Sequence, residues 1–226
     1  YDLNRYQKSI FSESKNNINL RTEALAFDDV LLVPQYSEIE SRANVNLNQN
    51  LDSNIKLKIP IISSPMDTVT EAAMARSMHE LGGLGIIHRY NSISEQTAMV
   101  RDVVMEGVHH PAAAIGVTGD FKERAMELVR SGVNILCLDV AHGHHILMER
   151  ALKTLKDSYG KSIHLMAGNV ATLEGFNDLA DWGADSVRCG IGGGSICTTR
   201  IQTGHGLPGL ATIFECAKSD RDAKII

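Results

Sequence analysis

The sequence lacks any hydrophobic stretch of the roughly 18 residues that a membrane-crossing helix needs. Residues 1–19 are polar and lack the apolar core of a secretory signal peptide. Long basic runs are missing as well, and the net charge is −5 over 226 residues, which argues against a nucleic-acid partner and against a membrane-surface partner. We therefore expect a cytoplasmic protein that binds neither nucleic acid nor membrane.

Cysteine is scarce, and no two cysteines have the Cys-x-x-Cys spacing of redox or zinc motifs. The four cysteines stand at positions 137, 189, 197 and 216, and three of them lie in or beside apolar strand-like or helical runs. This usage is typical of reduced intracellular thiols, so we expect no disulfide framework.

The hydrophobic content of 43% over 226 residues suits one sizeable domain. Residues 1–22 are rich in Ser, Asn and Lys, which predicts a polar N-terminal arm. The apolar run 27–34 predicts a small strand or a turn leading to the core, and the polar–apolar alternation of residues 36–58 predicts a half-exposed strand or hairpin.

From residue 59 onward, short apolar runs alternate with amphipathic helical patterns at intervals of about 22 to 28 residues. The apolar runs occupy residues 59–62, 84–87, 112–117, 135–138, 163–167 and 186–189. The predicted helices occupy residues 70–81, 94–106, 121–131, 146–158, 173–182 and 210–217, and residues 224–226 can begin a seventh strand. Strands that are apolar throughout indicate a parallel sheet covered by helices.

Two α/β architectures fit this repeat, a (β/α)8 TIM barrel and a doubly wound open sheet. The barrel is favoured because the units are regular and no dinucleotide fingerprint follows the first strand. Only about six to seven strands are present, whereas a barrel needs eight to close. We therefore predict a barrel catalytic domain over residues 23–226 that is incomplete at its C-terminal side.

Residues 190–200 form a glycine-rich stretch directly after the sixth strand, with Cys197 near its end. Such a loop offers backbone N–H groups to anions and carbonyls to cations, and Cys197 is a candidate nucleophile if its pKa is lowered. The alternative is a tight strand-to-helix turn with a buried cysteine.

Polar residues follow five of the predicted strands, at the end where barrels carry their functional groups. They are Ser63 and Ser64, His88 and Arg89, Asp139, Asn169, and the Cys197 loop. Each has a structural alternative, since Asp139 can accept ribose hydroxyls or cap a helix and His88 can be a core histidine. His142, His144 and His145 have no His-Glu-x-x-His pattern, which favours a structural or ligand-facing role over a metal centre.

Several motifs carry a resemblance to a known family. They lie at residues 26–34 (AFDDVLLVP), 63–71 (SSPMDTVTE), 82–89 (GGLGIIHR), 167–170 (AGNV) and 194–200 (GSICTTR). Together they resemble the IMP dehydrogenase/GMP reductase family over most of residues 23–217. The resemblance implies a (β/α)8 barrel, usually a homotetramer, whose cysteine loop follows the sixth strand.

The resemblance also implies roles for individual residues. Cys197 would attack C2 of the purine ring of IMP, with Thr199 assisting, and NAD would take the hydride on the way to XMP in guanine nucleotide biosynthesis. Ser64, Met66, Asn169, Gly194 and Ser195 would line the purine nucleotide site. Asp139, Arg188 and Gly190 would bind the cofactor, and the carbonyls of Gly192, Gly194 and Cys197 would hold K⁺.

The chain departs from the family pattern in places. Regulatory CBS modules, which most IMP dehydrogenases insert after the second strand, are absent between residues 103 and 111. Residues 139–141 and 202–204 are similar to GMP reductases, whereas residues 64–71 are similar to IMP dehydrogenases. The family's Asp-Gly-Gly phosphate segment and its flap with an Arg-Tyr base would lie beyond Ile226, so we expect these 226 residues alone to bind nucleotide poorly. GMP reductase, which takes GMP and NADPH, and a catalytically silent nucleotide-binding barrel remain alternatives.

Overall fold

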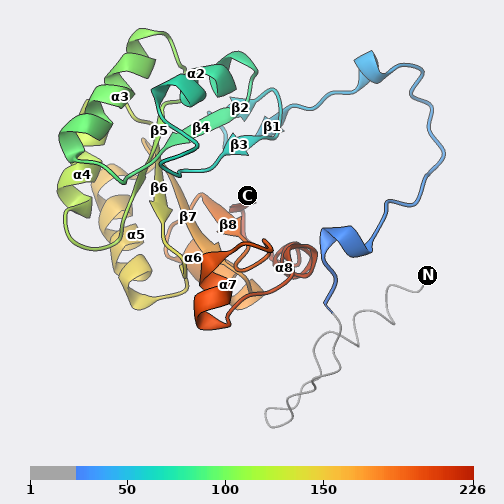
Figure 1. Cartoon of the computed structure of the whole chain (residues 1–226). Coiled ribbons are helices and arrows are strands. Elements are labelled where there is room, and N and C mark those ends of the chain that lie inside the picture. Colours follow the sequence, from blue (N-terminus) through green and yellow to red (C-terminus); the bar gives the residue numbers. More distant parts are fainter. Residues whose placement is uncertain (1–23) are drawn as a thin grey trace.

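A computed structural model of the chain describes residues 24–226, and the polar arm predicted for residues 1–22 lies outside them. Seven parallel strands form one curled sheet in the order β3-β4-β5-β6-β7-β8-β9, with helices on its outer side (Figure 1). The strands are β3 (Ile62–Ser63), β4 (Leu84–Ile87), β5 (Ala112–Ile115), β6 (Ile135–Asp139), β7 (His164–Val170), β8 (Ser186–Cys189) and β9 (Lys224–Ile225). The helices are α2 (Ala72–Glu80), α3 (Ile93–Met105), α4 (Phe121–Arg130), α5 (Ile146–Tyr159), α6 (Leu173–Asp181), α7 (Thr198–Thr203) and α8 (Gly209–Cys216). The predicted α/β class and partial barrel are confirmed.

The local chemistry of the sequence explains where the elements begin and end. The side chain of Ser92 accepts a hydrogen bond from the backbone of Glu95 and starts α3, and Thr172 starts α6 in the same way. Gly132 and Gly183 follow α4 and α6 with φ near +106° and +110°, a conformation that costs glycine little. These signals fix the sheet because each helix returns the chain to the start of the next parallel strand.

The core lies on both faces of the central strands. Strand β5 and the first four residues of β6 are buried throughout, as a parallel strand covered on both sides should be. One cluster packs the outer face against the helices through Leu128, Leu152 and Phe176. A second fills the interior of the barrel with Ile86, Ile135 and Met166. The interior is therefore packed, and binding sites are confined to the two ends of the barrel.

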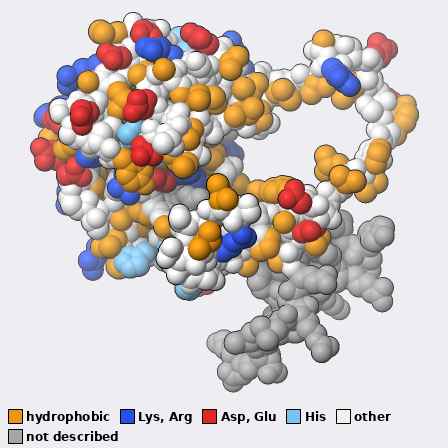
Figure 2. Space-filling view, in the orientation of Figure 1, with side chains coloured by type: hydrophobic (Ala, Val, Ile, Leu, Met, Phe, Trp, Pro, Cys, Tyr) orange, Lys and Arg blue, Asp and Glu red, His pale blue; other side chains and the backbone are white. Residues whose placement is uncertain are grey.

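The segment before β3 differs from its prediction. Residues Phe27–Asp29 form a 3₁₀ turn, and residues 30–48, which we call the apolar strap, contain no strand and only the 3₁₀ turn Arg42–Asn44. The predicted hairpin is confined to β1 (Gln49–Asn50) and β2 (Lys56–Leu57). The strap does not enter the core, because the side chains of Leu31 and Leu32 are 95% and 97% exposed. Figure 2 shows its orange side chains standing apart from the body of the barrel.

The β1–β2 hairpin covers the N-terminal ends of the strands. At its turn, Asp52 Oδ2 lies 2.6 Å from Nδ1 of His164, and Nε2 of His164 lies 2.8 Å from the hydroxyl of Ser186. His164 begins β7 and Ser186 begins β8, and both are buried. We call these three residues the basal network, since they join the hairpin to the base of the sheet.

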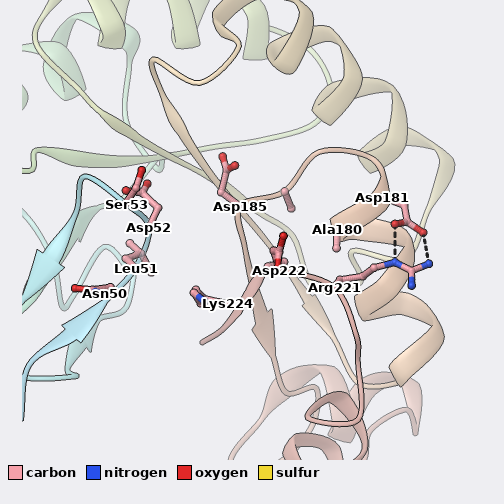
Figure 3. A pocket seen from close by; sticks show the side chains of 12 residues that line it. Asn50, Leu51, Asp52, Ser53, Ala180, Asp181, Asp185, Arg221, Asp222 and Lys224 are labelled. Carbon is pink, nitrogen blue, oxygen red and sulfur yellow. Dashed lines mark hydrogen bonds and ion pairs between the residues drawn. The ribbon is translucent and has the colours of Figure 1, made fainter.

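A cavity of about 680 Å³ opens beside this network, between the hairpin, α6 and the start of β9. Figure 3 shows Arg221 paired with Asp181 in the wall of this cavity. Arg221 donates to both carboxylate oxygens of Asp181, and Lys156 lies 2.8 Å from Oδ1 of Asp185. This cavity is thus at the end of the barrel away from the cysteine loop.

The sheet is open between β9 and β3. A cavity of about 450 Å³ lies there, lined by β3, β9 and the hairpin through Ile62, Ile225 and Leu57. Neither outer edge of the seven-stranded sheet has a further strand among residues 24–226. The opening is one strand position of a barrel, as the count of strands from the sequence predicts.

Candidate active site

The C-terminal ends of the strands bring the predicted polar residues to one edge of the barrel. Ser63 closes β3, Asp139 closes β6, Asn169 lies near the end of β7, and Arg188 lies in β8. The register pairs Asp139 with Gly168 and Gly168 with Arg188, so three neighbouring strands end at the same level. Gly168 is required there, because a Cβ would lie 2.7 Å from Cβ of Arg188.

The cysteine loop leaves this edge at Gly190, and it is held at both ends. Nδ2 of Asn169 donates to the carbonyl of Gly190 at 2.8 Å. The backbone N–H of Leu207 donates to the carbonyl of Ile191 at 2.9 Å. Gly192 has φ near +74°, and a Cβ on it would lie 2.8 Å from Cα of Gly206. Glycine at this position lets the outgoing and returning segments touch, which folds the loop over the strand ends.

Cys197 stands at the N-cap of α7 and is partly exposed. The backbone N–H of Arg200 lowers the pKa of its thiol, and burial opposes this effect. The backbone N–H groups of Thr199 and Gly192 and the Thr199 hydroxyl lower the pKa further, so the overall shift is downward. The chain does turn from β8 into α7 here, as the alternative interpretation expected, but the cysteine at the turn is only partly buried. The geometry provides an accessible thiol that is biased toward the thiolate.

The other cysteines behave differently. Cys137 is fully buried in β6, and burial raises the pKa of its thiol to about 11. Cys189 and Cys216 contact the same apolar cluster, and Cys216 is completely buried. Among the four thiols, Cys197 is the one that combines exposure with a stabilised thiolate.

Asp139 and Arg188 form an ion pair across β6 and β8, from Oδ1 of the carboxylate to the guanidinium. Their side chains are 17% and 18% exposed, so the pair borders solvent at the strand ends. Burial opposes the charge on Arg188, but Cys137 and Asp139 raise the pKa of its guanidinium overall. Oδ2 of Asp139 has no hydrogen-bond partner among residues 24–226 and remains available to a ligand.

Comparison with known proteins identifies the family of this chain. The family model described as "IMP dehydrogenase / GMP reductase domain" matches residues 24–226. The chain belongs to this family.

Individual relatives agree with the family match. An inosine-5'-monophosphate dehydrogenase of Cryptosporidium parvum is 38% identical over 86% of this chain and 58% of its own length. An enzyme of the same name from Nitrosopumilus maritimus is 29% identical over 88% of this chain and 68% of its own. A GMP reductase of Leishmania major is also 29% identical, over 87% of this chain and 67% of its own. The chain therefore spans about three fifths to two thirds of the length of these relatives.

The family's other predicted site residues are spread along the same edge. Ser64 and Met66 follow β3 and are exposed, with 51% of Met66 accessible. Gly194 and Ser195 lie at the exposed tip of the cysteine loop, and Arg200 donates to the carbonyl of Ser195 at 3.1 Å. The structure brings Asp139 to Arg188, Asn169 to Gly190 and Thr199 to Cys197. Ser64 and Met66 lie on the same edge of the sheet as these pairs, and that shared edge is their only link to them.

Two predicted ambiguities are settled by contacts. His88 is buried, and Nε2 of its ring lies 3.1 Å from Oε1 of Glu71. These contacts support a structural histidine at the end of β4. His145 caps α5 by accepting from the backbone of Leu147, and His144 lies 2.7 Å from Oδ2 of Asp178. The structural interpretation of these histidines is therefore supported for two of the three, and no group of three His, Cys, Asp or Glu side chains suited to a metal ion occurs among residues 24–226.

The sequence analysis missed a buried polar bridge behind this edge. Gln96 is completely buried, and its Nε2 donates to the carbonyls of His88 and Ala114 at 2.9 and 2.8 Å. Its Oε1 accepts from Arg124 at 2.9 Å. The signal available in the sequence was a polar residue on the inward-facing side of a predicted helix. In the structure, Gln96 ties the ends of β4 and β5 together.

The chemical character of the loop fits a monovalent cation. The carbonyls of Gly194 and Cys197 each accept one hydrogen bond, from Cys197 and Ile201, and each carbonyl keeps a second lone pair. Backbone carbonyl oxygens are the ligands that K⁺ takes in proteins.

Among the described residues, no helix is long and apolar enough to cross a membrane.

Proposed function

We propose that the chain forms the nucleophile-bearing part of an NAD-dependent IMP dehydrogenase, which converts IMP to XMP in guanine nucleotide biosynthesis. The observation that carries this proposal is Cys197, a partly exposed thiol of lowered pKa on a loop at the C-terminal edge of the barrel. Thiolates are strong nucleophiles and good leaving groups, which a covalent route through a purine ring requires.

In the proposed reaction, the Cys197 thiolate attacks C2 of IMP and forms a carbon–sulfur bond. C2 then loses its hydrogen as hydride, which leaves a thioimidate on Cys197. Water attacks the same carbon, the carbon–sulfur bond breaks, and XMP departs while the thiolate is restored. The Thr199 hydroxyl, which stabilises the thiolate, would assist at both the addition and the release.

The purine nucleotide would lie across the strand ends. Ser64 and Met66 would contact it from the β3 side, and Asn169 from β7. Gly194 and Ser195 would contact it from the tip of the loop, with Ser195 near the phosphate. These groups are hydroxyl, amide and backbone donors at an exposed edge, a combination suited to a phosphorylated nucleoside.

Bound NAD⁺ would accept the hydride that leaves C2. Oδ2 of Asp139 is free to accept hydrogen bonds from a ribose, while Arg188 fixes the carboxylate and Gly190 leaves room at the start of the loop. K⁺ held by the carbonyls of Gly192, Gly194 and Cys197 would shape the loop. We further propose that an eighth βα unit closes the opening between β9 and β3 and that the working protein is a homotetramer.

GMP reduction with NADPH is the second candidate, because relatives from Leishmania carry the name GMP reductase and residues 139–141 are similar to that group. There the same cysteine would take GMP, and ammonia would leave. A nucleotide-binding barrel without turnover is the third candidate.

One experiment separates the three. The native protein is followed at the reduced-nicotinamide absorbance band, once with IMP, NAD⁺ and K⁺ and once with GMP and NADPH. We expect a rise with IMP, and slower turnover when Na⁺ replaces K⁺. A fall with GMP would replace the dehydrogenase by the reductase, and no change in either mixture would leave the silent barrel.

A further inference from the structure

A second pocket lies at the N-terminal end of the barrel, away from the cysteine loop. Its volume is about 440 Å³, within the range of ligand-binding clefts. The pocket lies between β2, the end of α2, the turn into β4 and the connection from α3 to β5. We call it the histidine pocket, after His79, His109 and His110 in its wall.

Positive side chains converge on this pocket from separate elements. Lys56 and Lys58 come from the hairpin, and neither forms an ion pair among residues 24–226. The stem of Lys58 lies close against Gly82, where a Cβ would be 2.5 Å from Cβ of Lys58. The ring of His79 at the end of α2 lies 4.9 Å from the ring of His109, centroid to centroid.

The acidic residues of the wall do not cancel this charge. Glu106 is taken up by Arg76 at 2.6 Å, which leaves Glu80 as the other carboxylate of the lining. With neutral histidines, the two lysines outweigh Glu80 by one positive charge. Protonation of the three histidines would add three more.

His79 and His110 resist protonation in the absence of an anion. Burial lowers the pKa of His79 below its usual 6.5, and His109 and Lys58 lower it further, against an opposing effect of Glu80. Burial also lowers the pKa of His110, with His109 and His79 adding to the effect and Asp52 opposing it. An anion in the pocket would reverse these repulsions, because it favours the charged form of each ring.

We propose that the histidine pocket binds a multivalent phosphate anion, either free or as part of a phosphorylated metabolite. Lysine ammonium groups bind phosphate as point charges. A pocket lined by several cations favours an anion with several negative charges, such as a phosphate, over a ligand with a single carboxylate. Binding takes up protons, since the anion raises the pKa of the histidines. Affinity therefore rises as the pH falls from about 8 to about 6.

The test is isothermal titration calorimetry of the 226-residue chain with sodium pyrophosphate, at about pH 6 and about pH 8 and at constant ionic strength. We expect saturable binding that is at least about tenfold tighter at the lower pH. Orthophosphate and ATP are titrated in parallel. Pyrophosphate as the tighter ligand identifies a free anion, and ATP as the tighter ligand identifies the phosphates of a nucleotide.

Variants locate the binding. Lys58→Gln should weaken it about tenfold, and His79→Gln should remove much of the pH dependence. Lys161→Gln, an exposed lysine beside β7 at the same end of the barrel, should change neither, and Ser195→Ala tests the cysteine loop. Loss of binding in Ser195→Ala, equal affinity in Lys58→Gln and wild type, or no saturable binding at about pH 6 would overturn the proposal.

An independent readout follows the histidines themselves. Proton NMR of the ring Hε1 resonances, assigned with His79→Gln and His110→Gln, follows each ring with and without saturating pyrophosphate. The proposal requires upward pKa shifts for His79 and His110, whose pKa values are lowered in the free protein. Unmoved titration curves for these two rings would refute it even if heat is released.

Discussion

The basal network and the C-terminal edge of the barrel use their polar side chains in opposite ways. In the basal network, Asp52, His164 and Ser186 satisfy one another within 2.8 Å, and two of the three are buried. At the C-terminal edge, Ser64 and Ser195 are exposed, and Oδ2 of Asp139 has no partner among residues 24–226. The basal network uses its hydrogen bonds to hold the fold, whereas the C-terminal edge leaves donors and acceptors for a ligand. This division is what a barrel with a site at its strand ends requires.

The largest effect should come from the C-terminal edge. Cys197→Ala removes the nucleophile of the native protein, so turnover should fall by at least about 10³-fold while the dissociation constant of IMP changes little. Absorbance at the reduced-nicotinamide band measures turnover, and equilibrium binding measures the dissociation constant of IMP. Appreciable turnover in this variant would remove the covalent mechanism and with it the contrast between the two ends.

A smaller but still large effect is expected for thiol reactivity. The lowered pKa of Cys197 keeps a larger thiolate fraction as the pH falls, whereas the pKa of Cys137, raised to about 11, keeps that buried thiol protonated. At about pH 7, iodoacetamide should alkylate Cys197 at least about 100-fold faster than Cys137, and the ratio should persist at lower pH. Peptide mass spectrometry over time gives both rates, and IMP should protect Cys197. Comparable rates would show that the loop does not activate its thiol.

The smallest effect concerns stability at the N-terminal end. His164→Phe leaves Asp52 and Ser186 without their shared partner, so the free energy of unfolding should fall by about 2–4 kcal/mol. Ser195→Ala at the other edge and the exposed Asp157→Asn should stay within about 0.5 kcal/mol of wild type. Urea unfolding of the chain measures all three. If His164→Phe matches these controls, the basal network is not what holds the hairpin.

Acid should act on the same network. Burial opposes the charge on Asp52, but hydrogen bonds from the backbone of Asn54 and from His164 lower the pKa of its carboxyl overall below 3.8. A lowered pKa in the folded state contributes stability that is present above about pH 4 and is lost as the pH falls further. Asp52→Asn should therefore flatten the acid limb of the unfolding curve.

The sequence predicted the repeating part of the fold well, because that part depends on local patterns. The runs at 84–87 and 186–189 match β4 and β8 residue for residue. The run at 59–62 begins too early, since Pro60 lacks the N–H that a strand ladder needs and β3 starts only at Ile62. The alternation in residues 36–58 predicted a strand or hairpin, and only its last part forms one, as β1 and β2. No partner strand lies beside the strap among residues 24–226.

The site was partly predictable for a related reason. Strand ends meet at one edge in any parallel barrel, so the candidates could be gathered without knowing a single contact. Long-range pairs could not be found in this way. His164 and Asp52 are 112 residues apart in the chain, and only the folded hairpin brings them to 2.6 Å. Cys197 as the N-cap of α7 was also missed, since six residues carry too little periodicity to announce a helix.

The apolar strap also affects the tendency of the chain to self-associate. Leu31, Leu32 and Val33 are consecutive, and their side chains are 95%, 97% and 75% exposed. Contiguous exposed hydrophobic residues favour self-association without any unfolding of the barrel. We therefore expect a purified preparation of these 226 residues to become turbid sooner at higher protein concentration.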